Sequence, residues 1–287
     1  MVSDSSARKQ SRGLGAGSRK PEAGSWGRLL AIGTFLTLVL VSGARPASAQ
    51  TKTLVWDHYD VTLTIEPDGD LRVVERQVIR FLSGTFTQGW AVIPLDKTEG
   101  IDGVTVVDGD GVQYEEVGYS ANPYTFSTHR GDEGLEIEWS FPPVSEDVRT
   151  FALAYTVHGG LRVAEEGDTL QWMAIDNERD FPIQAASVTV RLPEGATFLA
   201  IDSAGVETLW NQGSGGSAVV FEAVQSLSPY DTLEVGIKFT HGVIPDRAPA
   251  WQAAQDVRDT YELTVRPLAT LGFGALAALV GLGGPLL

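Results

Sequence analysis

Short strand-like segments separated by turns fill almost the whole chain between residues 53 and 241. Tyr59–Ile65 alternates apolar and polar side chains with a period of two, and Leu71–Phe81 is again rich in β-forming residues. The intervening Pro67-Asp68-Gly69-Asp70 has the composition of a tight turn, so this part of the sequence predicts a β-hairpin. No stretch before Pro249 shows the sustained helical period of apolar residues every three or four positions.

The pattern repeats along the chain, with Gly, Pro, Asn or Asp clusters between strands at roughly the spacing of β-sandwiches. Asp108-Gly109-Asp110-Gly111 is a second candidate hairpin turn. The further strand candidates are Val104–Val107, Val112–Val117, Leu135–Phe141, Thr150–Val157, Thr169–Ile175, Ala185–Leu192, Thr197–Ile201, Ala218–Ala223 and Thr232–Thr240. We therefore predict an all-β fold, an antiparallel β-sandwich.

The sandwich is either one large unit or two tandem units. His158-Gly159-Gly160 and Asp176–Pro182 interrupt the strands, which suggests a first unit over residues 50–160 and a second unit, or a continuation, over 161–246. Single all-β domains also reach this size, so both arrangements fit. Ala250–Leu263 is the best helix candidate, within a juxtamembrane segment at 247–266.

Residues 1–49 have the features of a secretory signal peptide. A basic region precedes Leu29–Val41, thirteen uncharged residues, and Ala47-Ser48-Ala49 is a small-residue cleavage pattern that would leave Gln50 as the mature start. The apolar run is shorter than the roughly 20 residues a membrane helix needs. An uncleaved N-terminal anchor is the alternative.

Residues 267–287 are uncharged and long enough to span a bilayer, so they predict a transmembrane helix whose partner is lipid. With a cleaved signal, residues 50–266 would then lie outside the cytoplasm at the cell membrane. The sequence ends inside the apolar run with no Lys or Arg after it. It is therefore either a bare tail anchor or, as we expect, part of a longer membrane protein.

Charge and cysteine content exclude several classes of function. The net charge is −16, and from Gln50 onward 14 basic residues face 35 acidic ones. Nucleic-acid binding needs clustered Lys and Arg, so we expect no nucleic-acid partner. The chain has no cysteine, which excludes disulfides, thiol nucleophiles and Cys-ligated zinc.

Several segments together resemble domain-of-unknown-function family 2207, a set of predicted prokaryotic membrane proteins. The opening hairpin, an aromatic, Gly and Ile-Pro series, and three later strands carry the resemblance. These segments are Tyr59–Ile65, Pro67-Asp68-Gly69, Val73-Val74-Glu75, Phe81, Phe86, Gly89, Ile93-Pro94, Phe151–Val157, Gly159-Gly160, Asp168–Trp172 and Val188–Pro193. The resemblance implies an N-terminal extracytoplasmic region and further membrane helices downstream, and it implies no particular activity.

The sequence contains few motifs that indicate catalysis or metal binding. The four histidines, His58, His129, His158 and His241, lack metal-ligand spacing, and no nucleotide-binding or nucleophile motif occurs. Three groups of acidic residues could offer oxygen ligands to calcium. These groups are Asp68 with Asp70, Asp108 with Asp110, and Asp176 with Glu178 and Asp180. Asp-Gly is also a favoured turn, so we interpret the first two as turns, and we assign no metal, cofactor or catalytic residue.

A glycan-acting enzyme is the alternative to a non-catalytic module that binds or senses an envelope protein or glycan. Its support is five Trp in or near strands and two adjacent acid pairs. The residues are Trp56, Trp90, Trp139, Trp172, Trp210, Glu115-Glu116 and Glu165-Glu166. Adjacent strand residues point to opposite faces, so neither pair makes a catalytic dyad by itself. If the Trp instead build the core, four or more should be buried between sheets.

Overall fold

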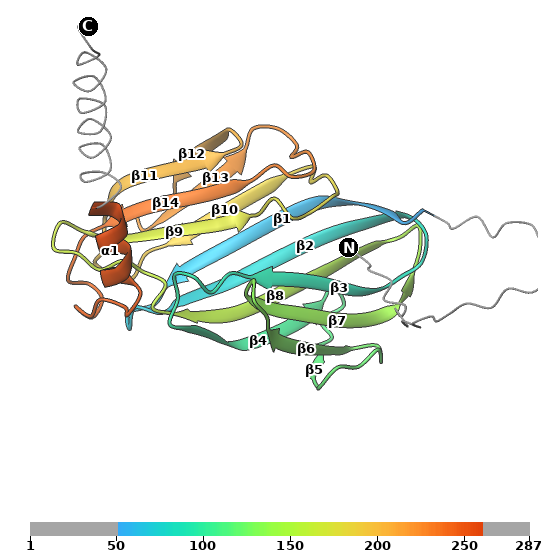
Figure 1. Cartoon of the computed structure of the whole chain (residues 1–287). Helices are drawn as coiled ribbons and strands as arrows, with labels where there is room; N and C mark the ends of the chain where they lie inside the picture. Colours follow the sequence, from blue (N-terminus) through green and yellow to red (C-terminus); the bar gives the residue numbers. More distant parts are fainter. Residues whose placement is uncertain (1–50, 261–287) are drawn as a thin grey trace, which may run out of the picture. The chain divides into compact units, whose positions relative to one another are not determined.

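The computed structural model describes residues 51–260, and this region is built almost entirely of β-strands (Figure 1). The signal peptide expected at 1–49 and the transmembrane helix expected at 267–287 lie outside the described residues. Among residues 51–260, no helix has the length and apolar character needed to cross a bilayer.

A seven-stranded sheet is the largest element, with the strand order β12-β13-β10-β1-β2-β8-β4. Its centre is the predicted hairpin, in which Ile65 of β1 pairs with Leu71 of β2. Gly69 in the turn has φ +89°, a conformation that glycine adopts without strain. The strands are β1 (Thr53–Ile65), β2 (Leu71–Ser83), β4 (Gly100–Asp108), β8 (Val148–His158), β10 (Ala186–Arg191), β12 (Thr208–Gln212) and β13 (Ala218–Ala223).

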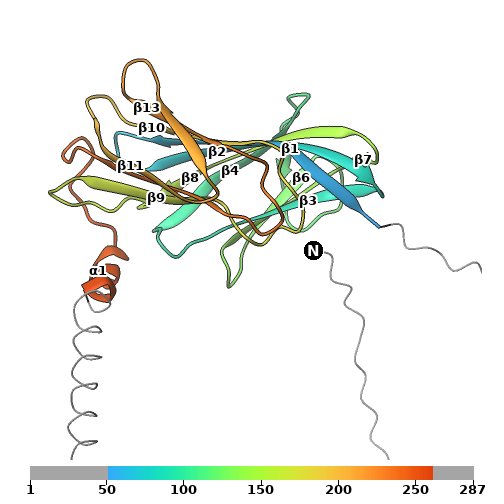
Figure 2. The same cartoon turned by 90° about the horizontal axis from the view of Figure 1, so that it is seen from above.

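Two smaller sheets complete the fold. One has the order β11-β14-β9, and the other has the order β3-β7-β6-β5. Figure 2 shows β9 and β11 toward one end of the domain, and β3, β6 and β7 toward the other. Their strands are β3 (Phe86–Ile93), β5 (Glu115–Glu116), β6 (Thr125–Arg130), β7 (Leu135–Val144), β9 (Asp168–Ile175), β11 (Phe198–Gly205) and β14 (Leu233–Phe239).

Period-two alternation builds one continuous core from all three sheets. On β2 every second residue from Leu71 to Phe81 is buried, while the residues between them are more exposed. Leu153 of β8, Ile137 of β7 and Val235 of β14 belong to the same apolar cluster. This burial of apolar area is the main favourable term available to a domain without disulfides.

The pairing of β1 with β10 is parallel, a departure from the purely antiparallel arrangement that we predicted. β10 follows β9, which belongs to another sheet, so the chain crosses between sheets and enters β10 in the direction of β1. A tight hairpin would have forced antiparallel pairing, whereas a long crossover permits a parallel pair. The same sheet thereby takes strands from both sides of residue 160.

Candidate binding groove

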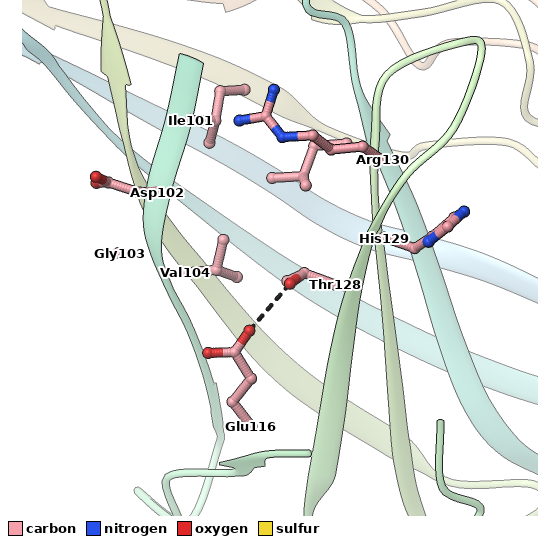
Figure 3. Close-up of a pocket in the computed structure, with 9 residues that line it drawn as sticks. Ile101, Asp102, Gly103, Val104, Glu116, Thr128, His129 and Arg130 are labelled. Atoms are coloured by element: carbon pink, nitrogen blue, oxygen red, sulfur yellow. Dashed lines mark hydrogen bonds between the residues drawn. The ribbon is translucent and has the colours of Figure 1, made fainter. Parts of the chain in front are cut away.

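An open groove lies between two strands that stand at sheet edges. β4 is the last strand of the seven-stranded sheet, and β6 is covered on its outer side only by the two-residue β5. The groove has a volume of about 320 Å³, near the lower end of the ~300–1,000 Å³ of small-molecule sites. Its lining residues are Ile101, Asp102, Gly103, Val104, Glu116, Thr128, His129, Arg130 and Leu135 (Figure 3).

A bulge in β4 shapes one wall. The register with β8 shifts between Asp102 and Thr105, and Gly103 inside the bulge has φ +63°. A residue with a Cβ would be strained in that conformation, so the bulge depends on glycine. Figure 3 shows Val104 directed toward the groove and Asp102 directed away from it.

The groove carries one cation and one anion on either side of apolar side chains. Arg130 reaches from β6 toward Ile101, and Glu116 lies on the far side of Val104 (Figure 3). The Thr128 hydroxyl donates a 2.9 Å hydrogen bond to Oε1 of Glu116, which holds that carboxylate in place. Among the ion pairs of residues 51–260, none involves Arg130. The guanidinium therefore remains available to a bound group.

His158 fixes the β4 wall from behind. Its Nδ1 lies 2.8 Å from Asp70 and its Nε2 lies 3.1 Å from Asp102. The hydrogen bond with Asp102 is the largest influence that raises the pKa of His158, and Asp70 adds to it. Two carboxylates thus favour the imidazolium form, which ties the turn before β2 to the strand that lines the groove.

The chain after β14 binds to the beginning of this same wall. The carboxylate of Glu99 accepts hydrogen bonds from Arg247 at 3.1 Å and from the backbone N–H of Ala250 at 3.0 Å. The N–H of Glu99 donates to the carbonyl of His158 at 2.7 Å. The Trp251 indole N–H donates to the carbonyl of Gly159 at 2.7 Å. Residues 247–251 therefore contact the stretch that leads into β4.

The helix α1 (Gln252–Thr260) confirms a helix in the predicted 250–263 window, and it is docked on the β-domain. Gln252 is buried, and its amide accepts from the N–H of Val163 at 2.9 Å and donates to its carbonyl at 2.7 Å. Arg162 lies 2.7 Å from Asp256. The Gln252 amide pairs with the backbone of Val163 as a neighbouring strand would. These two hydrogen bonds hold the start of α1 on the β-domain.

His241 anchors the segment that precedes α1. Its Nδ1 lies 2.9 Å from Oδ1 of Asp168, which is fully buried and also accepts from the N–H of Ala164 at 3.1 Å. The hydrogen bond with Asp168 is the largest influence that raises the pKa of His241. A buried carboxylate needs such partners, because an unpaired buried charge is costly.

The histidines and the acidic turns do not converge on a metal. His129 faces away from the groove in Figure 3, and within residues 51–260 no three His, Asp or Glu come together as ligands. Asp108 accepts hydrogen bonds from the N–H groups of Asp110 and Val112 at 3.0 Å. Asp68 does the same for Asp70 at 3.1 Å. These contacts support the interpretation of the two Asp-Gly motifs as turns.

The expectation that four or more Trp are buried between the sheets is wrong for the described residues, because only Trp139 is fully buried. Trp56 and Trp172 are partly buried against the core, while Trp90 and Trp210 are half exposed. β3 and β12, which carry the exposed pair, lie at sheet edges, so their side chains lack a neighbouring strand on one side. No Trp lines the groove.

The two acid pairs do not form dyads. Glu116 lines the groove and Glu115 does not, as the alternation along a strand requires. Glu165 and Glu166 are exposed in the connection between β8 and β9, where Glu166 is 3.9 Å from Arg162.

A buried polar cluster escaped the sequence analysis. The carboxylate of Glu75 accepts hydrogen bonds from the hydroxyls of Tyr59 at 2.7 Å and Tyr155 at 2.6 Å. Burial raises the pKa of Glu75, and it raises the pKa of both tyrosines well above the ordinary range. A Glu at an inward position of the Leu71–Phe81 alternation was the available signal.

Arg179, near this cluster, binds backbone carbonyl groups from two separate connections. Its guanidinium donates to the carbonyls of Phe181 at 3.0 Å, Ser228 at 2.8 Å and Asp231 at 2.6 Å. Burial lowers its pKa. Three backbone carbonyls thus stand in for water around this cation, which fixes the connection from β9 to β10.

Comparisons with known proteins give a family and a distant likeness of fold. The family model described as the N-terminal domain of a predicted membrane protein (DUF2207) matches residues 56–239. No curated protein matches the chain.

Two solved structures illustrate the likeness. Native leukotriene A4 hydrolase from Saccharomyces cerevisiae is 10% identical, with a TM-score of 0.44 over 64% of this chain and 29% of that one. An M1 zinc metallopeptidase variant from Deinococcus radiodurans is 12% identical, with a TM-score of 0.38 over 64% of this chain and 42% of that one. This chain spans less than half the length of either protein.

Proposed function

The chain belongs to domain-of-unknown-function family 2207, a family of predicted membrane proteins, and from that premise we propose that it is a membrane-tethered binding module. Residues 50–266 lie outside the cytoplasm after removal of a signal peptide, with the β-sandwich over 50–246 and a juxtamembrane segment over 247–266, and residues 267–287 anchor the module in the bilayer. The module binds an envelope component in the groove between β4 and β6, and this binding alters the conformation of the C-terminal segment that contains α1. It performs no catalysis.

One observation carries this proposal: the residues that lead to the predicted anchor are hydrogen-bonded to the residue directly before the strand that lines the groove. Glu99, the residue directly before β4, accepts two hydrogen bonds from residues 247–250, and Asp102 of β4 is held by His158. A ligand that moves this wall has a direct path to α1. Coupling between two sites is commonly carried by such networks of hydrogen bonds and packed side chains.

The groove chemistry supports binding rather than hydrolysis. Glycoside hydrolysis needs two carboxyl groups on either side of the scissile bond. Glu116 contacts Thr128, whereas Asp102 points away from the groove toward His158. The acid pair of a glycosidase is therefore not assembled here, and no Trp offers a stacking platform for a sugar.

The absence of native cysteines provides a direct test. In the full chain, Thr128→Cys modified with a bulky maleimide fills the groove, and Ser127→Cys carries the same group on the opposite face of β6. Hydrogen exchange of the α1 amides is then measured in both. We expect the Thr128 adduct to change exchange several-fold relative to the Ser127 adduct. Equal exchange in the two adducts would refute coupling between groove and helix.

A further inference from the structure

We propose that the groove takes an extended polypeptide segment, which adds as a short strand to the outer edge of β6. This inference rests on the proposed function and names the class of partner. The partner segment alternates its side chains and carries an acidic residue for Arg130. The occupant is thus another envelope protein rather than a glycan.

Residues 114–117 of this chain already lie as extended backbone between β4 and β6, next to the groove. The N–H of Tyr114 donates to the carbonyl of Val106 on β4 at 2.8 Å. One and three residues later, the same stretch bonds to the chain of β6: the N–H of Glu115 donates to the carbonyl of Tyr124 at 3.0 Å, and the N–H of Val117 donates to the carbonyl of Phe126 at 2.8 Å. Extended backbone therefore fits between these two edges.

The edge beyond that stretch is open. β5 pairs with β6 only at Thr125 and Phe126. Backbone groups along a strand face the same side at every second residue, so Thr128 and Arg130 continue the row that Phe126 begins. No other strand of residues 51–260 pairs with this side of β6. An unpaired row of N–H and C=O groups is a template for strand addition.

The charged residues of the groove indicate which side chains the partner segment should carry. The guanidinium of Arg130 stands over the beginning of β4, where a Cβ added to Gly100 would lie 3.7 Å from Nη2. It has no ion-pair partner among the described residues. Glu116 supplies the opposite charge across the apolar side chains. A strand with an acidic residue at one position and a basic residue farther along its groove-facing side complements both.

Strand addition differs from other modes of peptide binding because it uses the backbone N–H groups of the peptide. A phage-displayed library of random heptapeptides is selected on the full chain, and the selected peptides are resynthesised with single N-methyl groups. We expect alternating sequences that contain Asp or Glu. N-methylation at alternate positions, and Arg130→Gln in the protein, should each weaken binding about tenfold or more, as expected for loss of a hydrogen bond or of a charged contact.

Arg76→Gln is the matched control, because Arg76 is likewise an arginine with an exposed side chain but lies on β2 and does not line the groove. It should leave peptide binding unchanged. The inference is overturned if the library yields no peptide that the Thr128→Cys adduct blocks, or if N-methylation at every position is harmless. Such a failure is separable from the proposed function, because the exchange measurement on the groove adduct uses no peptide.

Discussion

Replacement of Glu75 tests how the core tolerates a carboxylate. Glu75→Ala removes the acceptor of two buried hydroxyls, those of Tyr59 and Tyr155, whereas Glu75→Gln keeps an oxygen and an amide in their place. Gln77→Ala is the matched control. It removes a side chain of the same size, two residues along the same strand and buried on the same side, whose carbonyl oxygen has no hydrogen-bond partner in the described part of the chain.

The magnitude follows from the two orphaned hydroxyls. A buried polar group left without a partner costs about 1–3 kcal/mol, so Glu75→Ala should lose about 2–6 kcal/mol beyond the packing loss measured with Gln77→Ala. Glu75→Gln should stay within about 1 kcal/mol of the parent at neutral pH, because removing a buried charge offsets the poorer hydrogen bond.

The pH dependence has a defined sign. Burial is the largest influence on the Glu75 carboxyl and raises its pKa above the ordinary value of 4.5. The folded protein therefore binds this proton more tightly than the unfolded chain does. The contribution of Glu75 to stability falls as pH rises from about 4.5 toward the folded-state pKa. Glu75→Gln should lack this decline.

Urea unfolding of the full chain in detergent, followed by Trp fluorescence at pH 5 and pH 8, measures both effects. The reasoning is refuted if Glu75→Ala is no less stable than Gln77→Ala. It is also refuted if Glu75→Gln and the parent lose the same stability between the two pH values.

Three further predictions concern the β3–β7 pair, the helix and the groove wall. A Cβ at Gly89 would overlap the ring of buried Trp139, so Gly89→Ala should lower unfolding free energy by about 1–3 kcal/mol in urea titrations. Gln252→Ala removes both amide contacts of α1, so trypsin should cleave near the helix faster while the β-core melts almost unchanged. Asp102→Asn removes the largest influence that raises the pKa of His158, so NMR titration should find that pKa lower than in the parent.

The hairpin and the Asp-Gly turns could be predicted because they depend on neighbouring residues. The alternation of Tyr59–Ile65 and the positive φ of Gly69 are local properties, and the structure has both. Strands β3, β6 and β12 were not predicted. Exposed residues interrupt the apolar alternation in these three strands, so their sequences do not indicate a strand. They form strands because they pair with neighbouring strands of the sheets.

The groove could not be found from sequence because its walls are distant along the chain. Ile101–Val104 and Thr128–Arg130 meet only after β4 and β6 have joined different sheets. The parallel entry of β10 and the docking of Gln252 on Val163 are likewise long-range outcomes. The apolar alternation of a strand indicates which of its faces is buried, but it does not indicate which edge stays unpaired.

Thiol labelling in intact cells tests the central claim, that a binding groove is displayed outside a membrane anchor. Thr128→Cys and Leu287→Cys are introduced separately into the cysteine-free full chain and exposed to a membrane-impermeant maleimide. The account predicts that Thr128→Cys is labelled in intact cells and Leu287→Cys only after lysis. Labelling of Thr128→Cys that requires lysis would contradict it.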